Sequence, residues 1–425
     1  MNKQADKIEI MAPVGSYESL SAAIQAGADS VYFGVGHLNM RSKSSQNFSL
    51  DDLDKISSIC RKNDVRTYIT LNTVIFDEEL ESMRAVVDAA IENRISAVIA
   101  SDMSVIQYAR QKGLEVHMST QTNITNIEAV RYYSQFADVM VMARELNIRQ
   151  VKQITEAIKK DGIYGPDGKL VQVEMFVHGA LCMAVSGKCY MSLDLLNSSA
   201  NRGACLQPCR RGYHVIDKRN EVEMQVDNEY IMSPKDLKTI DFLDKILKAG
   251  VAVLKIEGRG RSPEYVKTVV SVYKLAVRAY VENNFSQDNI AKWNRQLKTV
   301  YNRDFWDGYY LGKKLGEWTQ KPGSQATKKK IFVGTVTNYY SKIGVAEIRM
   351  QTNELKTSDD ILIIGPTTGV AEEAIQEIRV DMKNVNAAVK GETCSIPVRS
   401  LVRRSDKVYK LVDVDPDFDT DERYG

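Results

Sequence analysis

Cysteine and histidine are scarce in this chain, which has six of the former and four of the latter among 425 residues. Long apolar runs are missing altogether, and none approaches the roughly 20 residues that a membrane-spanning helix needs. The first seven residues also lack the apolar core of a secretory leader, so we expect a cytoplasmic protein with no membrane partner. Thiols stay reduced in that compartment, which argues against a disulfide framework for the cysteines.

The charge balance is compatible with a polyanionic partner. Lys and Arg outnumber Asp and Glu by 57 to 55, although the residues after Val412 are strongly acidic. The rest of the chain therefore carries a net charge of about +7. A mildly basic body allows a nucleic acid to bind but does not identify one.

Eight apolar segments of strand length alternate with helical patterns over the first 260 residues. These segments are Ile8–Ala12, Ser30–Gly34, Val65–Asn72, Ile95–Ala100, Leu114–Thr120, Asp138–Ala143, Val171–Val177 and Val251–Ile256. The alternation predicts an α/β fold, a (β/α)8-type barrel of the TIM-like kind. An open doubly wound sheet is the alternative, but Ala12–Ser16 is not the Gly-rich phosphate turn that usually follows its first strand.

The alternation is interrupted twice, by a turn at Tyr164–Gly168 and by a long insertion. Residues from about 179 to 233 form an insertion that is too long for a simple loop, and a helical pattern follows at Leu237–Lys248. Short β-patterned runs at the C-terminal end are typical of a small β-barrel. The expected organisation is a barrel domain with C-terminal helices at 1–320, a linker at 321–330, a small β-barrel at 331–412 and an acidic, disordered tail at 413–425.

Polar side chains alternate with apolar ones where the expected strands end, so the members of each set share a face. The sets are Glu115, His117, Ser119 and Gln121, then Glu174 and His178, then Lys255, Glu257 and Arg259, while Arg144 ends the sixth strand. The C-terminal ends of barrel strands converge on one mouth, so we expect a polar pocket there. Strand ends that are simply solvated are the alternative.

Four of the six cysteines, Cys182, Cys189, Cys205 and Cys209, lie in the insertion. Grouped thiolates suit a soft metal or an iron–sulfur cluster. Their spacing, Cys-x6-Cys followed by Cys-x3-Cys, is neither that of a zinc ribbon nor the compact ferredoxin run, so a cluster and zinc both remain open. Buried structural thiols are a third alternative, although the flanking Gly, Arg, Lys and Ser residues are unusual for them.

A nucleophilic cysteine is a further alternative. Glu174, His178 and Cys182 follow one another at intervals of four residues, and a Cys–His–Glu relay can be drawn through them. That spacing suits a helix, whereas this stretch is expected to be a strand running into a turn. The relay would also leave three thiols without a role.

The segment from Glu174 to Ser192 resembles the signature of peptidase family U-32 (U32) at every fixed position, Glu-x-Phe-x2-Gly-Ala-Leu-Cys-x4-Gly-x-Cys-x-Met-Ser. Residues 201–213, 233–237 and 254–259 also look like that family, and the resemblance covers about residues 8–400. The family name comes from an early collagenase assignment. Its better understood branches are oxygen-independent hydroxylation proteins, which act in ubiquinone synthesis, on ribosomal RNA, or on the wobble uridine of tRNA.

The resemblance implies a 4Fe–4S cluster on the four cysteines, with zinc as the alternative, and prephenate as a co-substrate that donates oxygen. Length and the added β domain make the chain most similar to the tRNA branch, which implies tRNA as a partner and 5-hydroxyuridine as the product. Some members place a ligand cysteine where this chain has Lys238, so the fourth ligand expected here is Cys209. Some relatives work in pairs, but no residue here identifies a partner protein.

Roles for the polar residues follow as hypotheses. Lys255, Arg259, Arg144 and Gln121 are expected to bind a small anionic co-substrate, because a guanidinium grips a carboxylate through two parallel hydrogen bonds. The candidates for proton transfer at the base carbon are His117, His178, Glu174 and Glu257. A peptidase, a ribosomal RNA hydroxylase and a non-catalytic RNA-binding module with a structural metal are the alternative functions.

Overall fold

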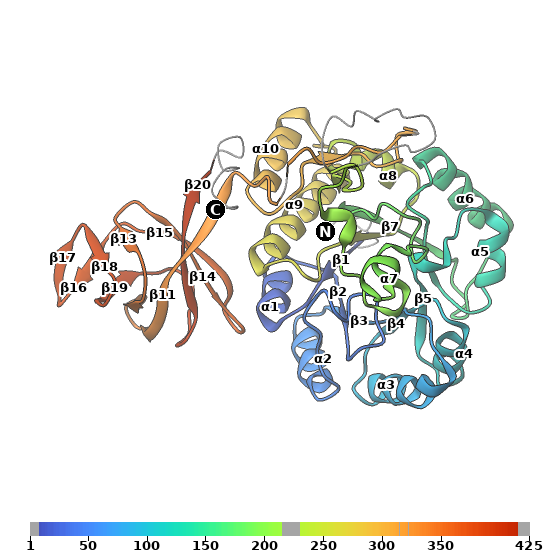
Figure 1. Ribbon diagram of the computed structural model, residues 1–425, viewed down its shortest axis with the longest axis horizontal. Coiled ribbons are helices and arrows are strands. Elements are labelled where there is room, and N and C mark those ends of the chain that lie inside the picture. Colours follow the sequence, from blue (N-terminus) through green and yellow to red (C-terminus); the bar gives the residue numbers. More distant parts are fainter. Residues whose placement is uncertain (1–7, 215–229, 314, 322, 415–425) are drawn as a thin grey trace.

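The computed structural model consists of an α/β barrel and a smaller β domain beside it (Figure 1). It describes residues 8–214, 230–313, 315–321 and 323–414. The barrel strands are β1 Glu9–Pro13, β2 Ser30–Gly34, β3 Arg66–Leu71, β4 Ala97–Ala100, β5 Glu115–Met118, β6 Val139–Val141, β7 Gln172–Gly179 and β9 Val253–Ile256. They pair in parallel in sequence order, and β9 closes the barrel by pairing with both β7 and β1. The predicted TIM-like barrel is confirmed.

A ring of helices surrounds these strands. Its members are α1 Tyr17–Gln25, α2 Asp52–Lys62, α3 Leu80–Glu92, α4 Met103–Gln111, α5 Ile127–Tyr133, α6 Ile148–Asp161, α8 Leu243–Lys248 and α9 Pro263–Val281, and α10 Gln287–Lys298 packs on α9. Polar residues before several helices accept hydrogen bonds from the first-turn N–H groups, as Ser16 does for α1 and Asn147 for α6. The sequence thus fixes where these helices begin.

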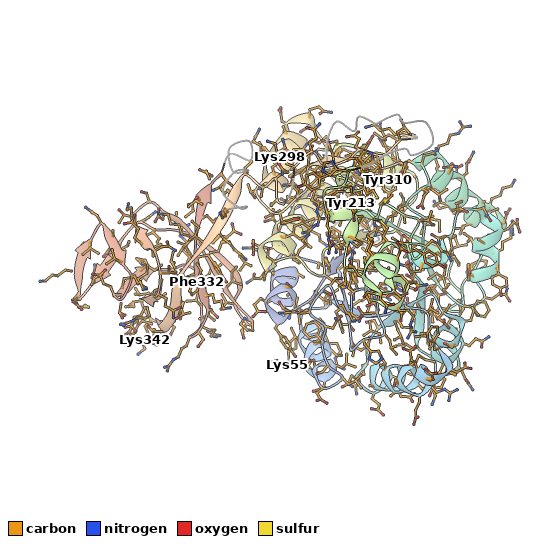
Figure 2. The ribbon with its side chains drawn as sticks, viewed as in Figure 1. Lys55, Tyr213, Lys298, Tyr310, Phe332 and Lys342 are labelled. Carbon is orange, nitrogen blue, oxygen red and sulfur yellow. The ribbon has the colours of Figure 1, made fainter. Side chains whose placement is uncertain are left out.

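Strand alternation separates two apolar clusters in the barrel domain. The larger cluster lies between strands and helices and includes Ile10, Val116 and Leu254. A second, smaller cluster fills the barrel interior with Met11, Tyr32, Tyr68, Ala97, Ile99, Val139 and Val253. Charged side chains occupy the same interior face, including Glu174 and Lys255. Tyr310, labelled in Figure 2, anchors the segment after α10 by donating a hydrogen bond to the Phe176 carbonyl at 2.8 Å.

The helix expected over Leu237–Lys248 is wrong in its first half. Asp236–Lys238 forms strand β8, which pairs antiparallel with the end of β7, and β10 Phe305–Trp306 adds to β8 in parallel. The helix α8 begins only at Leu243. Pairing with the free end of β7 overrides the helical spacing of the apolar residues, because tertiary contacts outweigh local propensity.

The smaller domain is an antiparallel β structure, as expected. Its strands are β11 Lys328–Tyr340, β12 Val345–Met350, β13 Glu354–Lys356, β14 Asp360–Gly365, β15 Gly369–Ala374, β16 Ile378–Val380, β17 Lys383–Val385, β18 Ala387–Val389, β19 Thr393–Pro397 and β20 Lys407–Asp413. Two expected boundaries differ, because the last linker residues begin β11 and Asp413 of the expected tail ends β20. The rest of that tail, residues 415–425, lies outside the described residues.

The β domain docks on helices α1 and α9 (Figure 1). Ala22 of α1 packs against Leu362, Ile364 and Val370 of the β domain. Polar contacts frame this cluster, among them the 2.6 Å hydrogen bond from Gln25 Nε2 to the Thr368 carbonyl. Mixed apolar and polar contacts fix the two domains against each other. Within the described ranges, no helix has the length and apolar character needed to cross a bilayer.

Candidate active site at the barrel mouth

The C-terminal ends of the barrel strands and the insertion enclose a cavity of about 150 Å³. The insertion contains α7 Met191–Leu196 and short 3₁₀ turns, and α7 lies in front of the barrel strands in Figure 1. Two glycines let the insertion approach the barrel. Both Gly187 and Gly203 have positive φ, and a β-carbon would overlap Gln121 at the first position and the Asn39 carbonyl at the second. The local sequence therefore shapes the lid of the cavity.

All four cysteines of the insertion line this cavity. They are free thiols, of which Cys182 is exposed and the other three are half-buried. Burial raises the pKa of the Cys209 thiol; Arg210 opposes this rise, whereas the other three cysteines add to it, so the four groups lie within electrostatic reach of one another. The remaining two, Cys60 and Cys394, are buried in α2 and β19, far from the cavity lining.

The four thiols gather around a space rather than at a point. Among the described residues, no group of three or more Cys, His, Asp or Glu side chains could hold a single metal ion as arranged. A zinc site needs four ligand atoms around one ion, each within about 2.3 Å of it. A 4Fe–4S cluster takes one cysteine per iron, so its ligand sulfurs stand farther apart. The four thiols are the donor set that a 4Fe–4S cluster takes, and all of them line one cavity.

Five cationic side chains also line the cavity, namely Arg41, Arg144, Arg210, Lys255 and Arg259. Among the described lining residues, Glu257 is the one carboxylate. Arg210 is fixed by hydrogen bonds to the carbonyls of Leu181 and Pro234, both at 2.7 Å. A cavity of this charge suits anionic groups.

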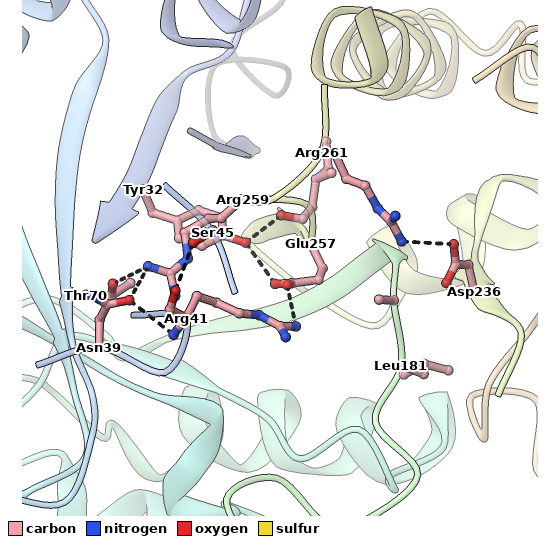
Figure 3. Close-up of polar contacts among 12 residues, drawn as sticks. Tyr32, Asn39, Arg41, Ser45, Thr70, Leu181, Asp236, Glu257, Arg259 and Arg261 are labelled. Carbon is pink, nitrogen blue, oxygen red and sulfur yellow. Dashed lines mark hydrogen bonds and ion pairs between the residues drawn. The ribbon is translucent and has the colours of Figure 1, made fainter. Parts of the chain in front are cut away.

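Glu257 is held by neighbours from one loop and one strand (Figure 3). Arg41 donates to it at 2.8 Å, and the Tyr32 hydroxyl donates to its other oxygen at 3.1 Å. Burial raises the pKa of the Glu257 carboxyl, but Arg41, Arg144 and Arg259 outweigh burial and bring that pKa down to about 2. Glu257 is therefore ionised at neutral pH, which makes it a poor proton donor.

Arg259 is the most buried of the cationic lining residues after Lys255, with 5% of its surface exposed. It donates hydrogen bonds to Asn39 Oδ1 at 3.0 Å and to Thr70 Oγ1 at 2.8 Å, and Figure 3 shows both contacts. Burial lowers the pKa of its guanidinium to about 10, so the group still carries its charge at neutral pH. Its two hydrogen-bond partners are neutral, and the Glu257 carboxylate is the charge that opposes it.

Arg144 and Gln121 also line the cavity. The Arg144 guanidinium stacks on the Phe176 ring at 3.9 Å and donates to the Ala180 carbonyl at 3.0 Å. Its buried Nε atom has no hydrogen-bond partner within the described part of the chain. Gln121 lies in a 3₁₀ turn at Thr120–Thr122, because β5 ends at Met118, and strand alternation therefore does not explain its position.

His117 and Glu174 lie inside the barrel, below the cavity rather than in its wall. Glu174 Oε1 accepts a 2.7 Å bond from Lys255 Nζ, and Lys255 reaches the cavity lining. His117 Nε2 lies 3.0 Å from Glu115 Oε1, at the start of β5. The structure thus brings these residues together in one row inside the barrel. Lys255 is the member of the row that lies at the cavity.

His178 lies apart from the other sites expected from the sequence. The register of β7 against β9 shifts between Phe176 and His178, so His178 does not share the face of Glu174. Its ring packs against Tyr273 of α9 and Phe305 of β10. Burial, together with Lys238 and Arg261, lowers its pKa to about 3. The Cys–His–Glu relay drawn through Cys182 is therefore not assembled.

Lys238 stands where some relatives are expected to have a ligand cysteine. It belongs to β8, forms an ion pair with Asp241 at 2.9 Å, and does not line the cavity. Within the described cavity lining, Cys209 is thus the available fourth thiol.

Two residues of the cavity lining, Arg41 and Arg210, could not be assigned to the site from the sequence. Arg41 lies in the loop between β2 and α2, and its position in a long loop after a barrel strand was the available signal. Arg210 follows Cys209 directly, but adjacency alone does not show that its side chain points into the same cavity. Trp306 and Tyr310, in the aromatic segment after α10, are buried.

A protein-family model described as Peptidase family U32 matches residues 15–320, which include the barrel and the cysteine-bearing insertion. The chain belongs to peptidase family U32. It is 58% identical over 403 residues to a protein named collagenase from Porphyromonas gingivalis (strain ATCC BAA-308 / W83), covering 95% of this chain and 97% of that one.

Two further relatives of this U32 chain carry other names. A tRNA hydroxylation protein of Bacillus subtilis (strain 168) is 31% identical over 368 residues, with 85% of this chain and 84% of that protein covered. A 23S rRNA 5-hydroxycytidine synthase of Escherichia coli (strain K12) is 31% identical over 283 residues. That match covers 66% of this chain and 41% of the synthase.

Proposed function

We propose that this U32 chain is an iron–sulfur-dependent enzyme that hydroxylates RNA without molecular oxygen. The substrate we assign is the wobble uridine of tRNA, which would become 5-hydroxyuridine. The observation that carries the proposal is the set of four thiols around one cationic cavity at the barrel mouth. Barrel enzymes place their active sites at this end.

Cys182, Cys189, Cys205 and Cys209 would hold the 4Fe–4S cluster. When bound, such a cluster supplies one-electron chemistry. Arg210 beside Cys209 and Arg41 beside Cys205 would offset the negative charge of the thiolates. The charge of the thiolates would thus account for these two arginines in the cavity lining even without a bound substrate.

The co-substrate we propose is a small carboxylate such as prephenate. Arg144 is suited to bind it, because its buried Nε–H has no partner and its ring stacking fixes the guanidinium plane. Arg259 and Lys255 would contribute positive charge from β9 and the loop that follows it. A guanidinium that presents parallel donors selects carboxylates over neutral ligands.

The assignment to tRNA draws support from the relatives and from charge. One relative is named a tRNA hydroxylation protein and another a 23S rRNA 5-hydroxycytidine synthase, so ribosomal RNA is the alternative RNA substrate. The net charge of about +7 outside the tail favours binding of a polyanion.

Nucleoside mass spectrometry of tRNA and ribosomal RNA tests this proposal. A strain that lacks the gene should lose 5-hydroxyuridine and its derivatives from tRNA, and the wild-type gene should restore them. Loss of a modified nucleoside from ribosomal RNA alone would redirect the assignment to that substrate. Unchanged nucleosides together with tight RNA binding would contradict catalysis and favour an RNA-binding module with a structural metal.

A peptidase is the second candidate function, favoured by the 58% identical relative named collagenase. It predicts that purified protein cleaves gelatin and that Cys182→Ala abolishes the cleavage. The geometry gives it less support, because His178 faces the helix layer and contacts Tyr273 rather than Cys182.

A further inference from the structure

We propose that Glu115, His117, Glu174 and Lys255 form a proton path through the barrel interior. The path would connect the cavity at the mouth with solvent at the opposite end of the barrel. It deepens the proposed function and rests on it for one point, namely that a group bound in the cavity gives up a proton during the reaction.

The four side chains contact one another in a row. Lys255 Nζ lies 2.7 Å from Glu174 Oε1, and Glu174 Oε2 lies 3.8 Å from His117 Nδ1. His117 Nε2 then lies 3.0 Å from Glu115 Oε1. Strands β5, β7 and β9 supply these groups, all on the inward face of the barrel. The first and last of these contacts are at hydrogen-bond distance, and the middle one is longer.

Both ends of this row of four side chains reach open space. Lys255 lines the cavity that the cysteines surround. At the other end, Glu115 pairs with Arg66 at 2.8 Å, and Arg66 and Glu9 line a second cavity of about 710 Å³ at the N-terminal ends of the strands. The Glu115 side chain is 22% exposed, whereas those of His117 and Glu174 are fully buried. Solvent thus reaches the lower end while the middle stays dry.

Folding alone does not call for these charges. The interior of such barrels is usually filled by branched aliphatic side chains, and a buried ion pair is often no more stabilising than apolar residues of similar volume. Here the interior apolar cluster has few members, and the charged groups take the remaining space. A chain of ionisable groups in that place therefore points to a use beyond stability.

The surroundings of His117 favour its charged form. Burial lowers the pKa of the imidazole, but the hydrogen bond with Glu115 and the charges of Glu115 and Glu174 outweigh burial and raise that pKa above its usual value. The Tyr68 ring packs at a tilt against His117, with ring centroids 4.6 Å apart, and its hydroxyl donates to Glu9. The groups that face His117 are thus two carboxylates and one aromatic ring, and they hold a transferable proton.

The contact between His117 and Glu174 is the one loose step. The atoms His117 Nδ1 and Glu174 Oε2 face each other at 3.8 Å, and neither has a hydrogen-bond partner among the described residues. A shift of about 1 Å would bring them to hydrogen-bond distance. This step can therefore act as the point where the path opens and closes.

The transfer is balanced without an oxidant or a reductant. His117 passes its Nε2 proton to Glu115 and on to solvent. A half-turn of the ring about its Cβ–Cγ bond then brings the bare Nε2 towards Glu174, where it takes the proton that Lys255 has passed to Glu174, and the ring turns back. Lys255 finally takes a proton from the bound group. Every member returns to its starting form, and one proton has left the cavity.

Exchange of the His117 ring protons with water tests the path without any need for catalysis. The chain has four histidines, so full-length protein labelled with ¹⁵N-histidine gives a spectrum that His117→Gln can assign. We expect the fully buried ring to exchange its protons readily, and Glu115→Gln to slow that exchange at least tenfold. Asp138→Asn is the matched control, because Asp138 is a buried carboxylate that instead accepts from the Asp167 backbone. Exchange that Glu115→Gln leaves unchanged would overturn the path.

Kinetics provide the second readout. His117→Gln should lower kcat for hydroxylation by about 100-fold, which is within the range for loss of one proton-transfer group. The variant should leave KM nearly unchanged and flatten the pH profile. A wild-type pH profile in that variant would contradict the proposal. If wild-type protein hydroxylates no RNA, the proposed function fails, while the exchange experiment still decides whether the path exists.

Discussion

Cys205→Ala should abolish the hydroxylated nucleoside and remove the bound iron. Loss of residues that merely support a metal ligand costs about 10- to 100-fold in affinity or activity, so loss of a ligand should cost more than about 100-fold. Cys205 is half-buried in the cavity wall, and alanine leaves its position without a donor. The measurements are iron content after anaerobic purification and tRNA nucleoside analysis in a complemented deletion strain.

Cys394→Ala serves as the control for that experiment. Cys394 is a fully buried thiol of β19 in the small β domain, and burial raises its pKa to about 11. We expect this variant to keep both its iron and its activity. If Cys205→Ala binds as much iron as the control and still modifies tRNA, the thiols of the insertion do not hold the cluster.

Lys255→Met should destabilise the protein by about 3 kcal/mol, the lower end of the range for breaking a buried ion pair. The Lys255 and Glu174 side chains are 5% and 0% exposed, so the variant would leave a carboxylate in the barrel interior with only the more distant His117 to offset its charge. Urea denaturation followed by circular dichroism measures the change in the free energy of unfolding.

The double variant Glu174→Leu with Lys255→Met should recover most of that loss, because two apolar residues of similar volume often replace a buried ion pair at little cost. Lys248→Met is the control: Lys248 pairs with Asp244 on the surface of α8, and we expect no measurable change. A double variant less stable than Lys255→Met would show that this ion pair is not the source of the effect.

The barrel could be predicted from the sequence because its strands are apolar on both faces and are separated by helices. Val253 and Leu254, for example, are both fully buried, one inside the barrel and one against the helices. Strands such as β15 and β17 were missed because they belong to a small domain and mix exposed polar residues with few apolar ones. Leu237 and Lys238 were assigned to a helix because strand pairing depends on residues far away in the chain.

The candidate site was partly predictable for a related reason. The four thiols and Lys255 could be found because they lie close together in sequence or on a strand end that alternates regularly. Alternation failed for His178, because an irregularity of one residue in β7 turns the following side chain to the other face. Arg41 could not be placed, since only the folded loop brings it to Glu257.

The most direct test of this account is the metal content of full-length protein purified without oxygen. Four thiolates that share one 4Fe–4S cluster should give brown protein with about four iron atoms and about four acid-labile sulfides per chain. Colourless protein with one tightly bound zinc ion and no sulfide would contradict the assignment of the cavity to an iron–sulfur cluster.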